Sequence, residues 1–430
     1  MRNKKDSGRG WIVAAVLGAL LVAGLLLARQ QSAPPTPTAS PASARGAAAT
    51  PGKPDLPDDP RLTIETLPPR RFKVINDHEH ILDEAQALRV LAAMDQLGIE
   101  KMALMGTSKY TFTLNNKYGF EEFRENNEEI LRIAKKYPTR FLAFPTIRPL
   151  DEGNLELMKD YIARGAAGLK LYLGHGASTG KEPFHLMPLD DPRLRPIYQY
   201  LQDNQIPISY HVNLTKYYDE FVRMMEQFPY LRVCLLHFGL YKNTPARLKA
   251  LGALLERYPN VYSDISFGWR DFQIEGFTKF NKHPKRYRDF LTRYQDRFMY
   301  ASDMVVEPMK DEAYIINTLR SYMQVLEMDR YRFFLEPKKP WRGLKLPDTV
   351  LRAIYEETPR RFHLLDAQGR PPDRSKGWPW PGWEAHTSMP GLPPTVAVVQ
   401  PLPPGTKVVG RPPASTSGPV ATPPGAGPGN

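Results

Sequence analysis

His78 and His80 are separated by one residue and follow an apolar run at residues 72–76. Side chains two positions apart on a β-strand point to the same face, so both imidazoles can face a single site. Two neutral imidazoles held in this way are suited to bind a divalent metal ion. The pair is weak evidence by itself, because nine histidines in 430 residues give roughly 0.2 such pairs by chance.

Four more ionisable side chains lie where apolar runs give way to loops, namely Lys170, His211, His237 and Asp303. A barrel of parallel strands places its catalytic groups at the carboxyl ends of its strands. Such placement at five different runs has no simple structural explanation. The sequence therefore predicts that these side chains, with the histidine pair, form one site.

The elements that would position this site alternate in type along the middle of the chain. We expect strands at residues 72–76, 101–106, 141–147, 168–173, 206–213, 232–237, 261–265 and 298–301. We expect helices at residues 83–97, 121–136, 155–163, 193–203, 217–228, 245–258, 287–294 and 311–326. Eight strand–helix units in about 295 residues are near the usual size of a (β/α)8 TIM barrel, an α/β fold. A doubly wound sheet is the alternative, but it normally carries a Gly-rich phosphate loop, which this sequence lacks.

The two ends of the chain differ from the middle. Residues 1–10 are basic, and residues 11–28 carry no charge and would span roughly 27 Å as a helix, close to the thickness of a bilayer core. We expect an uncleaved signal anchor with the rest of the chain outside the cytoplasm, periplasmic in a Gram-negative bacterium. A cleaved signal peptide is the alternative. Residues 29–71 read as a Pro/Ala-rich linker, residues 72–366 as the folded domain, and residues 367–430 as a disordered Pro/Gly-rich tail.

Composition narrows the function further. Of the 43 prolines, 26 lie outside residues 72–366, so the middle block is an ordinary globular domain. The whole chain has a net charge of +12, but this block has 43 basic and 39 acidic side chains, which does not suggest a nucleic-acid partner. The single cysteine, Cys234, excludes a disulfide scaffold and a zinc site built from cysteines, and we expect it to be buried.

Residues 72–366 resemble the amidohydrolase superfamily. The resemblance rests on His78 and His80, then His211, His237 and Asp303, in that order and on those strands. It is closest to the amidohydrolase-related group (amidohydrolase family 2), which includes aminocarboxymuconate-semialdehyde decarboxylase. The segment Glu-Thr-Pro-Arg-Arg-Phe at residues 357–362 is also similar to the last helix of that group.

The resemblance implies a metal site and roles for its residues. His78, His80, His211 and Asp303 would bind one divalent ion, with zinc as the first choice. Asp303 would also act as the base, and His237 would act as an acid, a base or an oxyanion partner. Hydroxide generated on the metal would attack an amide, ester or lactone carbonyl of a small molecule.

Other residues leave alternatives open. Lys170 could be carboxylated and bridge a second metal, could orient a substrate anion, or could only neutralise nearby acids. Arg270 could bind a substrate carboxylate, although a surface ion pair is the simpler reading. Tyr172 could line the pocket or only pack. Asp264 could orient an imidazole, although a hydrogen bond at the start of a loop is more common.

We therefore expect a metal-dependent hydrolase. One alternative is a non-oxidative zinc-dependent decarboxylase that uses the same metal and His237 as proton donor. A second is a catalytically silent binding module of the cell envelope. The substrate, the number of metals and whether the chain forms a homo-oligomer are left open.

Overall fold

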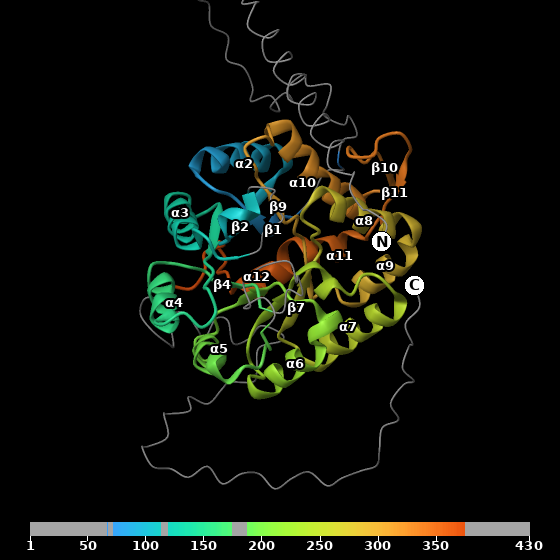
Figure 1. Cartoon of the computed structure of the whole chain (residues 1–430). Helices are drawn as coiled ribbons and strands as arrows, with labels where there is room; N and C mark the ends of the chain where they lie inside the picture. Colours follow the sequence, from blue (N-terminus) through green and yellow to red (C-terminus); the bar gives the residue numbers. More distant parts are fainter. Residues whose placement is uncertain (1–66, 68–71, 113–118, 174–186, 375–430) are drawn as a thin grey trace, which may run out of the picture. The chain divides into compact units, whose positions relative to one another are not determined.

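Eight short parallel strands follow one another in chain order in a computed structural model (Figure 1) that describes residues 67, 72–112, 119–173 and 187–374. The strands are β1 (Val74–His80), β2 (Ile99–Met105), β3 (Phe141–Phe144), β4 (Leu169–Leu171), β5 (Ile208–Tyr210), β6 (Val233–Leu235), β7 (Val261–Asp264) and β8 (Phe298–Met299). They pair as two sheets, with the order β3-β2-β1-β9 and the order β4-β5-β6-β7-β8. All of these pairs are parallel.

Backbone contacts join the two sheets at both seams and close the barrel. Between β3 and β4, Thr146 and Lys170 form a parallel bridge. Between β8 and β1, the amide of Asp77 donates to the carbonyl of Tyr300 at 2.9 Å. The short strand β9 (Met304–Val305) then pairs with Glu79 and His80 at the end of β1. The expected (β/α)8 barrel is therefore confirmed.

Helices follow the strands on the outside of the barrel. They are α2 (Glu84–Leu97), α3 (Phe123–Lys136), α4 (Asn154–Ala163), α5 (Arg195–Asp203), α6 (Leu214–Gln227), α7 (Pro245–Arg257), α8 (Arg270–Lys282), α9 (Pro284–Arg293) and α10 (Glu312–Glu327). Polar side chains begin several of them: the Asp83 carboxylate accepts from the amide of Gln86, and the Thr244 hydroxyl accepts from the amide of Arg247. The chain then adds α11 (Asp348–Arg352), a π-helical turn (Ala353–Glu357) and α12 (Thr358–His363).

Two clusters of buried side chains make the core. The larger one fills the space between strands and helices, and a smaller, separate one comes from the opposite face of the strands. Because successive side chains of a strand alternate in direction, the smaller cluster lines the inside of the barrel. It contains Cys234, which is fully buried as expected, and Phe362 of α12. Next to Phe362, Nε2 of His363 lies 2.5 Å from Oδ1 of Asp77, which ties the last helix to β1.

Four details differ from the expectations. Strand β1 continues through His80 instead of ending at residue 76, so both histidines lie on the strand itself. Helix α8 was not expected, because Gly276 and five aromatic or β-branched residues weaken its helical pattern; Gly276 is needed because a Cβ there would lie 2.5 Å from the ring of Phe267. Helix α9 begins three residues before the expected start. The chain after the last expected helix carries β10 (Arg330–Tyr331), which pairs with β11 (Trp341–Arg342) in a hairpin that we did not expect.

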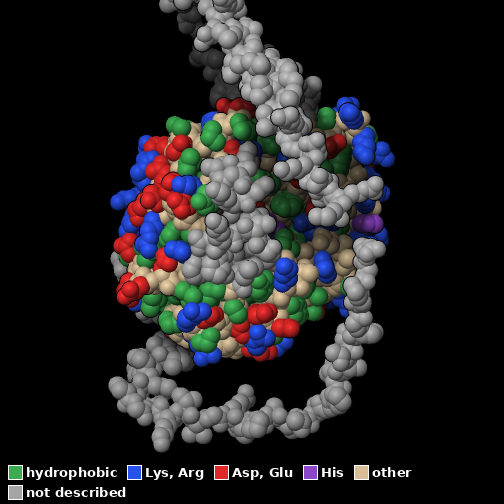
Figure 2. Space-filling view, viewed as in Figure 1, with side chains coloured by type: hydrophobic (Ala, Val, Ile, Leu, Met, Phe, Trp, Pro, Cys, Tyr) green, Lys and Arg blue, Asp and Glu red, His purple; other side chains and the backbone are tan. Residues whose placement is uncertain are grey.

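The expected anchor (11–28), most of the linker (29–71) and most of the tail (367–430) lie outside the described residues. Among the helices that the structure describes, none has the length and apolar character that crossing a membrane requires. On the face shown in Figure 2, acidic and basic side chains are intermixed beside α2–α4. Ion pairs there include Arg132 with Glu129 at 2.7 Å.

Candidate active site

A cavity of about 580 Å³ opens at the carboxyl ends of the strands. Strand ends from around the barrel contribute to its wall: His80 from β1, His211 after β5, His237 after β6 and Asp303 after β8. Tyr172, which follows β4, lines it as well. The barrel thus brings residues more than 200 positions apart in the sequence to one place.

Three of these side chains converge on one point at the base of the site. Nε2 of His78 and Nε2 of His80 lie 3.2 Å apart. Oδ1 of Asp303 is 3.0 Å from the first nitrogen and 3.2 Å from the second. Zinc–ligand bonds of about 2.0–2.1 Å place neighbouring ligand atoms roughly 3.0–3.4 Å apart. The spacing of these three atoms therefore fits a shared divalent ion.

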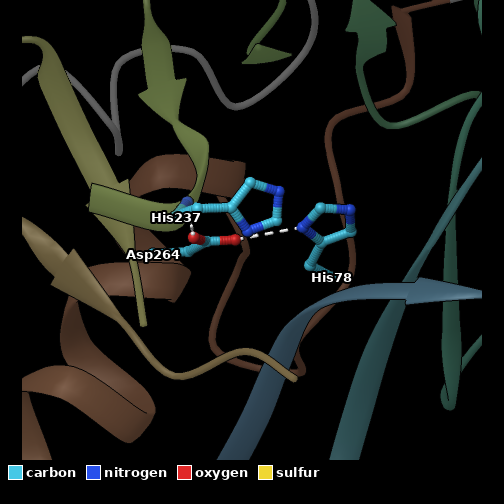
Figure 3. A group of neighbouring side chains, drawn as sticks. All are labelled: His78, His237 and Asp264. Carbon is cyan, nitrogen blue, oxygen red and sulfur yellow. Dashed lines mark hydrogen bonds and ion pairs between the residues drawn. The ribbon is translucent and has the colours of Figure 1, made fainter. Parts of the chain in front are cut away.

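The hydrogen bonds on the far side of each ring support the same conclusion. Nδ1 of His78 lies 3.1 Å from Oδ2 of Asp264 (Figure 3), and Nδ1 of His80 lies 3.0 Å from the carbonyl of Met105. A carboxylate and a carbonyl only accept hydrogen bonds, so each neutral ring carries its hydrogen on Nδ1. The lone pair of each Nε2 then points toward Asp303, which is the arrangement a metal-binding histidine needs.

Asp264 links two of the histidines. Its Oδ1 accepts from the backbone amide of His237 at 2.5 Å, and its Oδ2 also accepts from the hydroxyl of Ser266 at 2.8 Å. Figure 3 shows the carboxylate between the backbone of His237 and the ring of His78. Burial opposes ionisation of Asp264, but the hydrogen bond from His78 and the nearby His237 outweigh it and lower its pKa. The residue therefore orients an imidazole, the role that we had ranked below a loop-start hydrogen bond.

His237 begins a left-handed turn. Residues 237–240 have φ angles of 58°, 58°, 56° and 60°, a conformation that costs roughly 1–2 kcal/mol for each residue with a side chain. Backbone strain of this kind persists where surrounding structure holds it, and it clusters at functional sites. Nδ1 of His237 contacts the carbonyl of Ser266 at 3.2 Å and its hydroxyl at 2.8 Å. This leaves Nε2 facing Oδ2 of Asp303 at 3.5 Å.

Asp303 also has a left-handed backbone, with φ 53°, and its amide donates to the carbonyl of His78 at 2.8 Å. Gly268, with φ 72°, lies against its side chain. A Cβ at Gly268 would be 2.4 Å from Oδ2 of Asp303, closer than real contacts allow. Only a glycine at position 268 leaves room for the carboxylate of Asp303.

Burial sets the protonation of the site. It disfavours the charged imidazolium and lowers the pKa of His80 and of His237 to about 4, so both rings are neutral at pH 7. At Asp303 burial acts in the opposite sense, but His78 and His237 outweigh it and the pKa of the carboxyl lies well below its usual range. His78 differs: burial lowers its pKa, but the charge of Asp303 and the hydrogen bonds to Asp264 and Asp303 outweigh burial and raise it. His80, His237 and Asp303 are thus in the form that binds a cation, and a cation at His78 would take the place of a proton on Nε2.

Lys170 lies beside this donor set and is fully buried. Its Nζ is 2.9 Å from Nε2 of His78 and 4.9 Å from the centre of the Tyr172 ring. Burial lowers the pKa of Lys170 to about 8, against the opposing charges of Asp303 and Asp264. The contact is compatible with a bridging carboxylated lysine and with a cation that balances the acidic groups.

His211 and Tyr172 form the next part of the wall. The two rings stack with centroids 6.3 Å apart, and the ring of His211 meets that of His237 edge-on at 4.8 Å. The hydroxyl of Tyr172 donates to the carbonyl of Gly106 at 3.1 Å. His211 is not among the three residues whose ligand atoms converge; its ring packs between those of Tyr172 and His237.

Arg270 is not where a clamp for a substrate would need to be. It is the first residue of α8, its side chain is 57% exposed, and its guanidinium lies 3.4 Å from Oδ1 of Asp271. It does not line the cavity, whereas Lys242 does. Sequence reasoning missed Lys242 because it lies in a loop five residues beyond His237, where nothing distinguishes it from a surface lysine.

Several solved structures and one family model match this chain. No curated protein matches the sequence. Among solved structures, the chain is similar to 5-carboxyvanillate decarboxylase from Sphingomonas paucimobilis (14% identity, 69% of this chain and 100% of that one, TM-score 0.43). It is also similar to 2,6-dihydroxybenzoate decarboxylase from Rhizobium (16%, 69% and 99%, 0.42) and to 4-oxalomesaconate hydratase from Rhodopseudomonas palustris (16%, 68% and 95%, 0.42). A family model described as amidohydrolase (Amidohydro_2) matches residues 78–364, about two thirds of the chain, so the chain belongs to the amidohydrolase family.

Proposed function

We propose that this chain is a metal-dependent hydrolase that acts on a carbonyl of a small molecule. The observation that carries the proposal is the convergence of Nε2 of His78, Nε2 of His80 and Oδ1 of Asp303 within 3.2 Å of one another. His211, which lines the same cavity, is proposed as the fourth ligand. A divalent ion held there, with zinc as the first choice, would polarise a carbonyl oxygen and make water more acidic.

The protein residues divide the remaining work. Oδ1 of Asp303 faces the two imidazoles, whereas Oδ2 faces His237, so the carboxylate can pass a proton from one side to the other. Nδ1 of His237 is held by Ser266, which leaves Nε2 free to accept that proton and donate it to the leaving group. Asp264 holds His78 and the backbone of His237 in place throughout.

The cavity wall supports binding of a flat organic substrate. Phe120 and Phe267 are buried beneath its surface, and Tyr172 presents its ring toward His211. Trp269 and Phe272 line it as well, and Phe272 is 56% exposed. Aromatic walls exclude water and stack on planar groups.

Decarboxylation is a second candidate, and these aromatic walls favour it. A conjugated planar acid is the kind of substrate whose carbanion is stabilised when carbon dioxide leaves. In that reaction His237 would supply the proton that replaces the carboxyl group, while the same ligands hold the ion. Lys170 bears on the number of ions in either case, since its carboxylated form would add a second one.

A substrate panel on the metal-loaded full chain tests the two reactions. Planar lactones and aromatic amides or esters report hydrolysis, and aromatic carboxylic acids report release of carbon dioxide. The class of substrate that reacts identifies the reaction. Loss of that turnover in His237→Asn, with metal content retained, supports the proposed role of His237. Metal binding without turnover of either class would favour the binding module.

We also propose that the chain is a membrane-anchored enzyme with its barrel outside the cytoplasm. The support is the uncharged run at residues 11–28 behind four basic residues. Protease added to spheroplasts, whose outer membrane has been opened, should digest the barrel domain. Protection of the domain, or its recovery in the soluble fraction, would contradict the anchor.

A further inference from the structure

We propose that Lys242 binds an anionic group of the substrate and selects for substrates that carry one. The inference takes the cavity as the substrate site, and so rests on the proposed function to that extent. It does not depend on whether the reaction is hydrolysis or decarboxylation. Lys242 lines the cavity two residues after the left-handed turn that carries His237.

The side chain of Lys242 is enclosed but has no anionic partner. The residue is only 6% exposed, and its Nζ lies 5.1 Å from the centre of the Phe267 ring, which also lines the cavity. Among the described residues, no hydrogen bond or ion pair satisfies Nζ. The backbone carbonyl of Lys242 accepts from the hydroxyl of Tyr287 at 2.5 Å, which holds the loop in place.

The nearby charges leave the ammonium unbalanced. Glu275 also lines the cavity, but it pairs with Lys279, which in addition donates to Oδ1 of Asn243 at 2.7 Å. Asp271 pairs with Arg270. Lys242 is the one lysine or arginine among the described residues of the cavity wall.

An enclosed ammonium without a partner is costly, because it loses hydration and gains little in return. A negatively charged group that enters the cavity and contacts Nζ of Lys242 would offset this cost. An aromatic face at 5.1 Å compensates in part and also defines a surface along which a flat molecule can lie. A carboxylate on such a molecule would complete the pairing, which is the role that Arg270 cannot fill from the surface.

Binding of benzoate and of its neutral analogue benzamide to the full chain, measured by calorimetry, tests the inference. Lys242→Met should weaken benzoate binding about 10- to 100-fold and leave benzamide within about twofold, as expected for loss of a charged hydrogen bond. Lys242→Arg should retain most of the affinity for benzoate. Lys282→Met is the matched control, because Lys282 is an exposed lysine of α8 that does not line the cavity, so the change removes the same charge and leaves the Glu275–Lys279 pair intact.

Three outcomes would overturn the inference: equal benzoate affinity in wild type and Lys242→Met, an equal loss in Lys282→Met, or no saturable benzoate binding to the wild type. Metal content, measured in parallel, should be the same in all four proteins. Benzoate binding through the metal alone would disappear with a chelator but would not respond to Lys242. If the wild type holds no metal and yet binds benzoate through Lys242, the proposed function fails and this inference stands.

Discussion

Nδ1 of His78 lies 3.1 Å from Oδ2 of Asp264, although 186 residues separate the two in the sequence. Both side chains are fully buried, and the contact crosses the barrel from β1 to β7. The acidic oxygen keeps the hydrogen on Nδ1 and so directs the free lone pair of His78 toward Asp303. Asp264 therefore acts through the imidazole, and its removal should be felt as a loss of metal affinity.

Asp264→Asn tests this role. The amide cannot accept from His78 and from Ser266 as the carboxylate does, so we expect metal affinity to fall about 10- to 100-fold. Competition with a chromophoric chelator measures the affinity directly. Asp271→Asn, an exposed acid near the cavity mouth, is the control and should change nothing. Unchanged affinity in Asp264→Asn would show that His78 needs no such support.

Gly268→Ala should displace the carboxylate of Asp303. The new Cβ would lie 2.4 Å from Oδ2, and φ at this position is 72°. Gly153→Ala is a matched control, because φ there is 76° but nothing lies within 4 Å of the added Cβ. We expect both variants to lose about 1–2 kcal/mol of unfolding free energy from backbone strain. Only Gly268→Ala should also lose metal affinity and turnover; an equal effect of the two on metal affinity would contradict the contact.

His363→Ala should destabilise the fold without emptying the metal site. The change would leave Asp77 buried and without the partner that lies 2.5 Å away, and breaking a buried pair costs about 3–5 kcal/mol. Burial already raises the pKa of Asp77 against the favourable effect of His363. Denaturant unfolding measures the loss, with the exposed His283→Ala as control. Equal stability of the two variants would rule out the proposed link between β1 and α12.

Anion binding should weaken above pH 8. Burial lowers the pKa of Lys242 to about 8, with Glu275 opposing the shift and Lys279 adding to it. The ammonium is therefore present below pH 8 and lost above it, and benzoate affinity should fall about tenfold for each further pH unit. Lys242→Arg keeps its charge and should show no such fall. A wild-type affinity that is constant across pH 8 would contradict a charged Lys242.

The same shift affects stability in a known direction. Between pH 8 and the ordinary lysine value of 10.5, the unfolded chain holds more protons than the folded one. The contribution of Lys242 to stability therefore rises with pH in this window. The difference in unfolding free energy between wild type and Lys242→Met should change accordingly, with the wild type gaining relative to the variant.

The barrel and the convergence of its strand ends were predictable from the sequence, because apolar runs and helical patterns alternate eight times. His78, His80, His237 and Asp303 could be named because each stands where such a run ends. The full burial of Asp77 and Glu79 between these histidines was not predictable, since both are polar and only tertiary contacts bury them.

Sequence reasoning missed, or only partly recognised, the residues whose roles depend on tertiary contacts. Asp264 was recognised as a candidate, but its value depends on the relation of β7 to β1 across the barrel, which no local pattern encodes. Gly268 and Lys242 carry no local signal at all. Conversely, the guanidinium of Arg270 is suited to bind a substrate carboxylate, but its position at the start of α8 places it on the surface.

The most direct test of the account is the metal content of the full chain, purified without chelator and analysed by mass spectrometry. The account predicts about one divalent ion per chain, lost in His80→Ala and retained in His283→Ala, whose histidine is exposed and remote from the converging ligands. A second ion that disappears in Lys170→Met would extend the site to two metals without changing its three-residue core. A wild type that binds no zinc or manganese, or a His80→Ala variant that keeps its ion, would contradict the account.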